Sequence, residues 1–279
     1  MQAQKIIIDP NNQNSRYFKD ILNFKGLFYF LAWRDVRVRY KQTSIGVLWA
    51  LFRPLLTIFS LSLIRFIFTR NESSLVPVPL EIAAGTLPWT FFASAFSDTS
   101  NSLVSNANLV SKVYFPRIIV PASAIIVCLI DFFISLVIVA GIMIFYGVVP
   151  GVQVFLLPVF LLLAVITALG AGLYITSLNV KYRDFRYIIP FIVQFGMFVS
   201  PVMFTSEQFY ALNIPLWLKN IYALNPMVSV IDGFRWCLFG GQTTIEPIKF
   251  VISASVGIAL LALGIITFRK MEKDFADVI

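Results

Sequence analysis

The stretch Ile118–Tyr146 decides the fold: it reads IIVPASAIIVCLIDFFISLVIVAGIMIFY and contains a single charged residue, Asp131. An α-helix needs about 20 predominantly apolar residues to cross a bilayer, and this run is longer. The run is continuously apolar, whereas strands of an outer-membrane barrel alternate lipid-facing with lumen-facing residues. The stretch therefore predicts a membrane-crossing helix that is long enough to be tilted.

The composition of the whole chain agrees with this stretch. Of its 279 residues, 58% are apolar and only 13% charged, and the mean hydropathy is +0.83. Soluble domains carry about 25% charged residues, and disordered chains are poor in hydrophobic residues. Both classes are excluded, and the predicted fold class is an all-α integral membrane protein.

Five further apolar runs bring the prediction to six transmembrane helices. They are Ile45–Phe68, Glu81–Ser105, Val152–Leu178, Tyr187–Phe204 and Phe250–Phe268. Glu81–Ser105 is the weakest, since its second half reads SDTSNSLVS. The predicted transmembrane domain spans residues 42–268, between an N-terminal tail of residues 1–23 and a C-terminal tail of residues 269–279.

The positive charges predict the orientation. With the N-terminus in the cytoplasm, sixteen of the 22 Lys and Arg residues fall on the inner side and four on the outer side. Inner loops of membrane proteins are enriched in Lys and Arg, so both termini are expected in the cytoplasm. The net charge of +8 is therefore explained by topology, and no nucleic-acid partner is expected. The polar N-terminus lacks the apolar core of a signal peptide.

The segment 24–41 combines an aromatic and a cationic stripe at helical spacing. The aromatic stripe is Tyr29, Trp33, Val36 and Tyr40, and the cationic stripe is Arg34, Arg37 and Lys41. Two such stripes about 100° apart are typical of an amphipathic helix that lies on an anionic inner leaflet. The alternative is that this segment simply begins the first span.

A second unusual segment, Ser206–Glu246, is predicted on the outer side. Its two apolar pieces, Phe209–Leu224 and Met227–Phe239, are separated by Asn225-Pro226, and each is too short to span alone. Two short apolar helices joined by a turn suit a re-entrant hairpin buried against other helices. An outer amphipathic loop at the lipid surface is the alternative.

Catalytic and metal-binding motifs are absent from the sequence. The chain has no His, and its two cysteines, Cys128 and Cys237, suggest no disulfide framework. No Gly-Lys-Ser/Thr phosphate-binding motif or other catalytic signature is found. The acidic residues at membrane depth are Asp98 and Asp131, on different helices. The sequence thus predicts a non-catalytic chain without metal ligands.

Charges inside the membrane are functional candidates. At a rise of about 1.5 Å per residue, Arg53 lies about 12 Å into the first span and Asp98 about 10 Å into the second, both from the inner side. The similar depths predict that Arg53 and Asp98 pair or share a wet cavity. The pair either locks two helices together or acts in a gate. Arg65, near the outer end, is assigned no function.

Polar and aromatic faces on the spans are candidates for a channel wall. Ser94, Asp98, Asn101 and Ser105 form one stripe on the second span, which is either a pore lining or a helix-packing seam. Aromatic faces occur on the first and fifth spans and could stack on the C–H faces of sugars, or face lipid or the core. They consist of Trp49, Phe52 and Phe59, and of Phe191, Phe195 and Phe198.

Several stretches resemble the permease subunits of ABC transporters that export O-antigen, capsule and teichoic acid. They are YKQTSIGVLWALFRPLL (Tyr40–Leu56), NANLVSKVYFPRIIVP (Asn106–Pro121) and NVKYRDFRYIIPFIVQFGMFVSPVMF (Asn179–Phe204). The NPM of Asn225–Met227 followed by Arg235 is also similar. The resemblance covers the chain from about Asn23 to the C-terminus.

The resemblance implies a six-span subunit that forms a homodimer in the bacterial inner membrane and moves a lipid-linked polysaccharide. ATP and Mg would bind a separate cytoplasmic ATPase subunit, and this chain would carry no cofactor. Residues 106–117 would be the coupling helix and 179–186 a second contact. The implied ATPase contacts are Asn106, Leu109, Lys112, Tyr114, Phe115, Arg117, Arg183 and Asp184.

The resemblance also assigns two gates. The interfacial gate helix would be 24–41, with Trp33, Arg34, Arg37 and Tyr40, and the re-entrant outer gate would be 206–239, with Asn225, Pro226 and Arg235. The channel would be lined by the polar and aromatic faces of the spans. These candidates are Trp49, Phe52, Arg53, Phe59, Ser94, Asp98, Asn101, Phe191, Phe195 and Phe198.

Three other functions compete with this interpretation. An ABC permease for a drug or small lipid would share the architecture. A membrane-embedded glycosyltransferase would use outer acids, and Glu207, Asp232 and Glu246 are available, although no His accompanies them. An ion-coupled carrier would require paired acids near mid-membrane, where Asp131 stands alone in the sequence.

Overall fold

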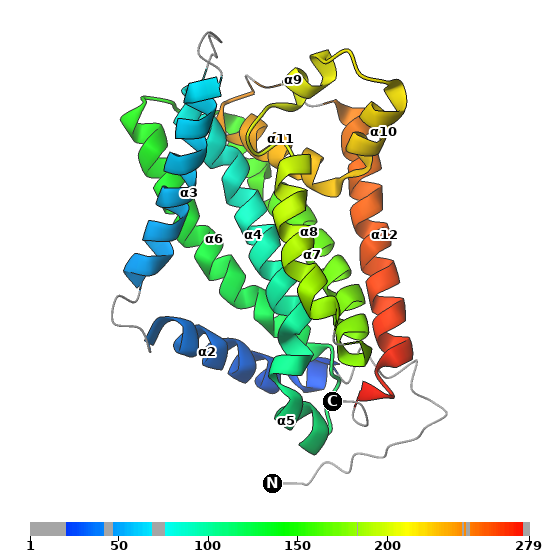
Figure 1. Cartoon of the computed structure of the whole chain (residues 1–279). Helices are drawn as coiled ribbons and strands as arrows, with labels where there is room; N and C mark the ends of the chain where they lie inside the picture. The colour runs from blue at the N-terminus through cyan, green and yellow to red at the C-terminus, as the bar shows by residue number, and fades with distance from the viewer. Residues whose placement is uncertain are drawn as a thin grey trace.

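The computed structural model describes residues 21–41, 47–68, 76–182, 184–241, 243 and 246–275. Within these residues the chain is helical and contains no β-strand (Figure 1). The principal helices are α2 (Lys25–Lys41), α3 (Val47–Phe68), α4 (Val78–Ser105), α5 (Ala107–Lys112), α6 (Ile119–Phe145), α7 (Leu157–Lys181), α8 (Phe185–Val199), α9 (Ser206–Ala211), α10 (Leu216–Leu224), α11 (Pro226–Leu238) and α12 (Pro247–Met271). The short 3₁₀-helix η1 (Val152–Leu156) precedes α7. The all-α class predicted from the apolar runs is confirmed for these residues.

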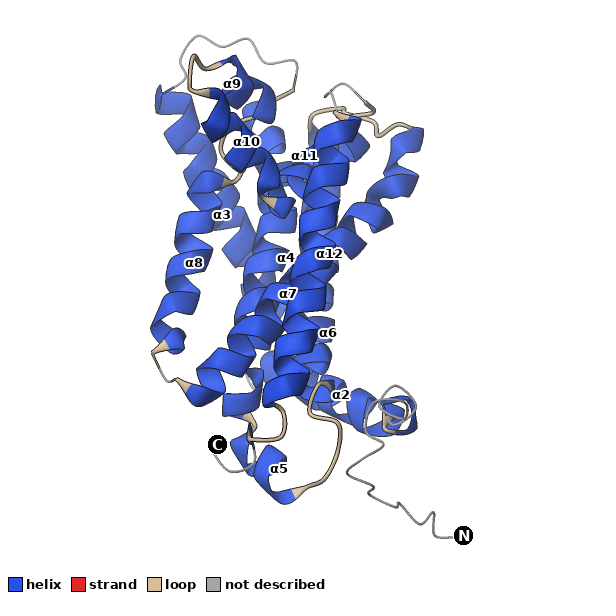
Figure 2. Ribbon diagram, turned by 90° about the vertical axis from the view of Figure 1, so that its right-hand side faces the viewer, coloured by secondary structure: helices blue, strands red, loops and turns tan. Residues whose placement is uncertain are grey.

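The long helices run side by side, and α2 lies across one end of them (Figures 1 and 2). We call the end that carries α2 and α5 the lower end, and the end that carries α9 and α10 the upper end, as in Figure 1. Three helical segments are long and apolar enough to cross a membrane: Ile119–Phe145, Val152–Lys181 and Pro247–Met271. These correspond to the predicted third, fourth and sixth spans.

Helix α4, the weakest of the predicted spans, is the centre of the bundle. It packs against α3, α6, α7, α8 and α11, and most of its residues are buried. Several of its polar side chains, among them Thr99 and Ser100, are therefore surrounded by other helices. Small residues such as Ala83, Ala84 and Ala95, all fully buried, let the neighbouring backbones approach closely.

Helix α8 is shorter than the predicted span Tyr187–Phe204. It begins at Phe185 and ends at Val199, and Ser200 is extended with ψ of 153°. The next residue is Pro201, whose ring disfavours the helical conformation of the residue before it. The sequence prediction was wrong here because it counted apolar residues across this proline.

The segment between α8 and α12 folds into three short helices at the upper end (Figure 1). Thr205 begins α9 with a capping box that involves Gln208. The predicted first piece, Phe209–Leu224, is divided between α9 and α10, and Pro215 precedes α10. The predicted break at Asn225-Pro226 is confirmed, since α10 ends at Leu224 and α11 begins at Pro226.

Two hydrophobic clusters hold the bundle together. The larger one fills the middle and the upper end around α4, α6, α7 and α11. The smaller one lies at the lower end and joins Leu31 of α2, Val110 of α5, Phe115, and Phe268 of α12. The smaller cluster thus fixes α2 and α5 to the ends of the long helices.

Helices α7 and α12 cross at two glycines. A Cβ atom added to Gly264 would overlap the carbonyl oxygen of Gly170, and one added to Gly170 would overlap the backbone of Leu261. Two helices can approach this closely only where neither has a side chain. The crossing therefore depends on both glycines.

We expect Gly264→Ala to destabilise the protein by about 1–3 kcal/mol, because the new methyl group must push α12 away from α7. Thermal unfolding in detergent, followed by size-exclusion chromatography, measures the change. Gly141→Ala is the matched control, since a Cβ there meets no atom within 4 Å. Equal midpoints for the two variants would contradict the tight crossing.

Candidate functional site

Charged side chains from three helices meet near the lower end of the bundle. Arg39 of α2 donates from Nη1 to Oδ2 of Asp131 on α6 at 2.7 Å, and from Nη2 to Oδ2 of Asp98 on α4 at 3.1 Å. We call Arg39, Tyr40, Asp98, Asp131 and Cys128 the Arg39 cluster. One guanidinium thus joins the two acids at membrane depth, and it comes from the helix that lies across the bundle.

Tyr40 and Cys128 complete the Arg39 cluster. The Tyr40 hydroxyl donates to Oδ1 of Asp131, and the Cys128 thiol donates to Oδ2 of Asp98 at 3.4 Å. Burial would lower the pKa of Arg39, but Asp98 and Asp131 outweigh it and the pKa is raised. Burial and the bond to Asp131 raise the pKa of Tyr40 as well. Arg39 therefore stays charged and Tyr40 stays a hydrogen-bond donor.

The predicted pair of Arg53 and Asp98 does not form. Asp98 pairs with Arg39, and no ion pair joins the described side chains of Arg53 and Asp98. Arg53 is exposed on α3. The depth argument compared only charges within spans, whereas the partner of Asp98 comes from the segment that precedes the first span. Asp131, which stands alone in the sequence, shares this same partner.

The polar stripe on α4 serves two neighbours. Asn101 accepts a hydrogen bond from Nδ2 of Asn179 on α7 at 3.2 Å, and Asn179 also donates to the Ser100 carbonyl at 3.0 Å. Thr176 of α7 donates to the Thr99 carbonyl at 2.8 Å. Asn101 thus lies at a helix-packing seam, and Asp98 belongs to the Arg39 cluster. Ser94 is half-buried and Ser105 exposed.

The aromatic faces of α3 and α8 point out of the single chain. The exposed fractions are 51% for Phe52, 66% for Phe59, 66% for Phe191, 59% for Phe195 and 60% for Phe198. The rings of Phe191 and Phe195 stack, with centroids 5.8 Å apart. The side chain of Trp49 lies outside the described residues. These faces cannot line a channel inside one chain, and they must meet lipid or a second chain.

The gate-helix candidates on α2 fall on different sides of the helix. Tyr29 and Trp33 stack with centroids 6.5 Å apart and are exposed, and the Arg37 guanidinium lies 5.1 Å from the centre of the Trp33 indole. Tyr40 points inward to Asp131 instead. The residues that bury α2 are Leu31 and Ala32, which belong to neither predicted stripe.

Helix α5 protrudes from the lower end (Figure 2). Val110 and Phe115 anchor it in the smaller hydrophobic cluster, with Leu109 packed against them, and Asn106 accepts a 2.7 Å hydrogen bond from Nη2 of Arg34. Lys112, Val113 and Tyr114 are exposed, with Tyr114 at 65%. We call these three residues the α5 tip.

Arg117, another candidate of this region, is held inside the chain. Its backbone N–H donates to Oε1 of Glu272 at 2.8 Å, and its guanidinium donates to the Glu272 carbonyl oxygen. Arg117 therefore attaches the start of α6 to the end of α12. In the second loop Asp184 is exposed, and Arg183 lies outside the described residues.

At the upper end, Arg235 is buried at the junction of three segments. Its exposed fraction is 1%, and its guanidinium donates to the carbonyls of Phe204 at 2.9 Å, Val202 at 3.2 Å and Glu81 at 3.4 Å. Asp232 is the nearest acid, at 4.0 Å. One side chain of α11 thus holds the end of the α8–α9 connection against the start of α4.

Asn225 and Pro226 shape the start of α11. The Asn225 side chain accepts from the Met227 N–H at 3.0 Å and donates to Oγ of Ser200 at 3.0 Å. Ser253 of α12 donates to the carbonyls of Asn225 and Pro226 at 3.2 and 3.0 Å. The Asn-Pro turn is therefore pinned to both α8 and α12.

A buried ion pair beside Arg235 was missed in the sequence. Nη1 of Arg65 on α3 lies 2.8 Å from Oε2 of Glu81 on α4, and the side chains are 6% and 8% exposed. Arg65, to which the sequence assigned no function, thus has a partner inside the bundle. Glu81 is the first residue of the predicted second span. A charged residue in a span needs a partner, and this could have indicated a cation on the neighbouring helix.

A family model described as an ABC-2 type transporter matches residues 26–239. An O-antigen export system permease protein RfbA of Klebsiella pneumoniae is 26% identical over 248 residues, which cover 88% of this chain and 92% of the relative. A protein of the same name from Myxococcus xanthus is 25% identical over 266 residues, covering 94% and 98%.

A capsule polysaccharide export inner-membrane protein, CtrC of Neisseria meningitidis, is 24% identical over 258 residues, which cover 90% of this chain and 93% of the relative. These relatives therefore match between 88% and 94% of this chain and not one segment only. The family model also covers most of the chain and includes the Arg39 cluster, the α5 tip and Arg235. This chain belongs to the ABC-2 type transporter family.

Proposed function

We propose that this chain is the channel-forming permease subunit of an ATP-driven exporter that moves lipid-linked polysaccharide across the bacterial inner membrane. The observation that carries the proposal is the match, over 88–94% of this chain, to relatives named for O-antigen and capsule polysaccharide export. The chain itself has no phosphate-binding motif. ATP and Mg would therefore bind a separate cytoplasmic subunit.

In this proposal the lower end faces the cytoplasm. Exposed cations at that end, such as Lys41, Lys112 and Lys181, support the orientation through the positive-inside rule. Helices α3, α4 and α8 would join the three clearly apolar helices as spans, giving six. The segment from α9 to α11 would be the re-entrant outer gate, and α2 the interfacial gate helix.

Two copies of the chain would form the channel. The exposed aromatic faces of α3 and α8 support this arrangement. The rings of Phe191 and Phe195 stack, and such rings offer a flat apolar wall to the C–H faces of sugars. A wall built from ring faces does not fix the register of a polymer. Successive sugar units could therefore slide past it.

The α5 tip would dock on the ATPase subunit. An exposed Lys at the end of an anchored short helix and an exposed Tyr just after it suit a protein contact, because interface hot spots are enriched in aromatic residues. Arg117 would support this helix from inside and not touch the partner. This assignment narrows the coupling contact to residues 112–114.

We expect the double variant Lys112→Glu/Tyr114→Ala to reduce the co-purifying ATP-binding subunit at least about tenfold, because hot-spot truncation costs ≥ 2 kcal/mol. A pull-down in mild detergent from native membranes measures the amount of partner. Lys273→Glu, exposed at the same end, is the control and should leave it unchanged. A full partner band with the double variant would refute docking at the α5 tip.

A further inference from the structure

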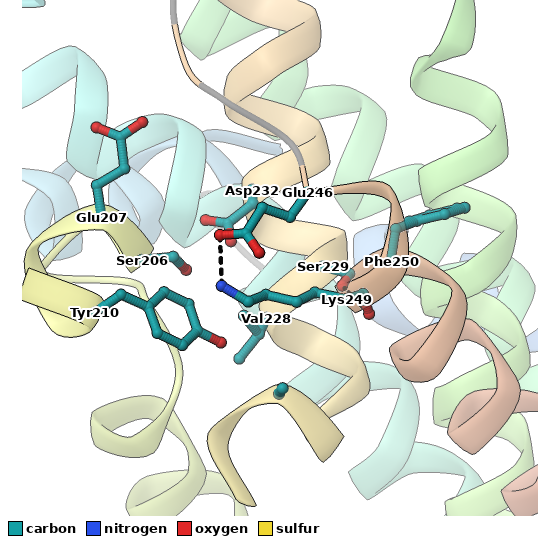
Figure 3. A pocket seen from close by; sticks show the side chains of 10 residues that line it. Ser206, Glu207, Tyr210, Val228, Ser229, Asp232, Glu246, Lys249 and Phe250 are labelled. Carbon is teal, nitrogen blue, oxygen red and sulfur yellow. Dashed lines mark hydrogen bonds and ion pairs between the residues drawn. The ribbon is translucent and has the colours of Figure 1, made fainter. Parts of the chain in front are cut away.

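A cavity of about 290 Å³ lies at the upper end between α9, α10, α11 and the start of α12. Figure 3 shows the side chains that line it, with Ser206 and Tyr210 from α9 opposite Asp232, Glu246 and Lys249. Val228 and Ala223 supply apolar lining. The Arg39 cluster, Arg235 and the α5 tip are not part of this cavity.

Some polar groups of the cavity already have partners within the chain, and others are available to bind a ligand. Nζ of Lys249 lies 2.5 Å from Oε1 of Glu246 and 3.3 Å from the centre of the Tyr210 ring. The Lys249 ammonium thus fills the position that a cationic ligand would take. The Tyr210 hydroxyl oxygen is buried and has no hydrogen-bond partner among the described residues. Burial and the carboxylates of Glu246 and Asp232 raise the pKa of Tyr210 to about 12, so this hydroxyl stays protonated.

The charge of the cavity restricts its ligand. The single ammonium among the lining residues, that of Lys249, is already paired with Glu246. The Arg235 guanidinium, 4.0 Å from Asp232, donates to backbone carbonyls. The cavity therefore offers no unpaired cation to phosphates, uronic acids or other anions, and the carboxylates of Asp232 and Glu246 repel them. Among the described residues, no three acidic or sulfur side chains are grouped closely enough to hold a metal ion. A neutral ligand with many hydroxyl groups fits, because carboxylates accept hydrogen bonds and the hydroxyls of Ser206, Ser229 and Tyr210 can also donate.

We propose that this cavity binds one uncharged sugar unit as the glycan leaves the upper end of the protein. This rests on the proposed function, and it names the neutral sugar as the ligand class at the outer gate. The volume lies at the lower limit of the about 300–1,000 Å³ typical of ligand pockets, which suits a single ring and not a stretch of polymer. Because α9 to α11 form the cavity, an occupied cavity would hold these helices in one arrangement.

Saturation-transfer NMR on the full-length chain tests the proposal, with the chain purified into nanodiscs together with any subunits that accompany it and without ATP. The probes are neutral methyl hexosides, methyl 6-deoxyhexosides and N-acetylhexosamines, with D-glucuronate as the anionic comparison. We expect a saturable signal from at least one neutral probe and a signal at least about tenfold weaker from glucuronate, because the carboxylates of the lining repel its negative charge.

Two variants and a control locate the binding site. Asp232→Asn and Glu246→Gln are expected to weaken neutral-sugar binding at least about fivefold through the loss of charged acceptors. Glu246 is exposed, so its substitution keeps the test valid even where Asp232→Asn does not fold. Asp274→Asn makes the same charge change at the lower end and should bind as the unmodified chain does.

The outcomes separate this inference from the proposed function. No signal from any neutral probe, equal binding by all variants, or glucuronate binding as tightly as the neutral sugars would overturn the sugar site. Export that proceeds without such a site would leave the permease function intact. Sugar binding in a chain that shows no export would support the site and refute the transport function.

Discussion

Arg39→Glu is expected to reduce polysaccharide export at least about tenfold while the chain still reaches the membrane. The substitution places a third carboxylate beside Asp98 and Asp131, which Arg39 now joins at 3.1 and 2.7 Å. Like charges at such short distances repel, and α2 would move away from α4 and α6. Cell-surface glycan per molecule of membrane-inserted permease, measured by immunoblotting, gives the effect.

A charge exchange tests whether export is lost because the ion pair is broken or because α2 tolerates no charge reversal. The double variant Arg39→Asp/Asp131→Arg restores one attraction, and we expect it to recover a substantial part of export. Lys25→Glu makes the same charge reversal at the exposed start of α2 and should have little effect. If Lys25→Glu and Arg39→Glu reduced export equally, the Arg39 cluster would have no specific role.

Arg235→Met is expected to destabilise the fold by about 3–5 kcal/mol, the typical result of removing one member of a buried charged arrangement. The carbonyls of Phe204, Val202 and Glu81 would lose their donor, and Asp232 would lose its nearest cation. Arg235→Lys should recover little, because an ammonium lacks the planar fork that reaches several acceptors at once. The unfolding midpoint in detergent measures both variants.

Arg53→Met is the matched control for this experiment. Arg53 is exposed on α3, so the same substitution there should cost less than about 1 kcal/mol. Similar midpoints for Arg53→Met and Arg235→Met would show that Arg235 does not hold the upper end together.

The sequence predicted most helices because apolar runs report directly on contact with lipid. Helix α4 shows the limit of this signal, since its hydropathy is weak although it is the central helix. Its neighbours α3, α6, α7 and α8 surround it, and a helix covered by protein can carry Asp98 and Asn101 without meeting lipid. Hydropathy therefore measures exposure to the bilayer and not membership of the bundle.

The partners of charged residues could not be predicted from the sequence. Arg39 stands among four positive residues between positions 34 and 41, and this cluster indicated a surface helix. Only the three-dimensional arrangement shows that α2 crosses below α4 and α6 and directs Arg39 and Tyr40 inward. Arg65 and Glu81 were missed for the same reason, since each was judged by its depth in its own span.

The family motifs mark the loops but do not separate the kinds of residue within them. NANLVSKVYFPRIIVP contains an exposed tip, Lys112–Tyr114, an anchor, Val110 and Phe115, and an internal brace, Arg117. These three kinds of residue follow one another without any change in composition. Burial and hydrogen bonding, which only the folded chain reveals, separate them.

The most direct test of the proposed function is transport by proteoliposomes that contain this chain with its co-purified ATP-binding subunit. The measurement is the appearance of a fluorescently labelled lipid-linked polysaccharide at the face opposite the ATPase, read by a membrane-impermeant quencher. We predict movement that requires ATP and Mg and stops when the ATP-binding subunit is omitted. Movement without the ATP-binding subunit, or ATP-driven movement of small lipids or drugs but not of the glycan, would contradict the account.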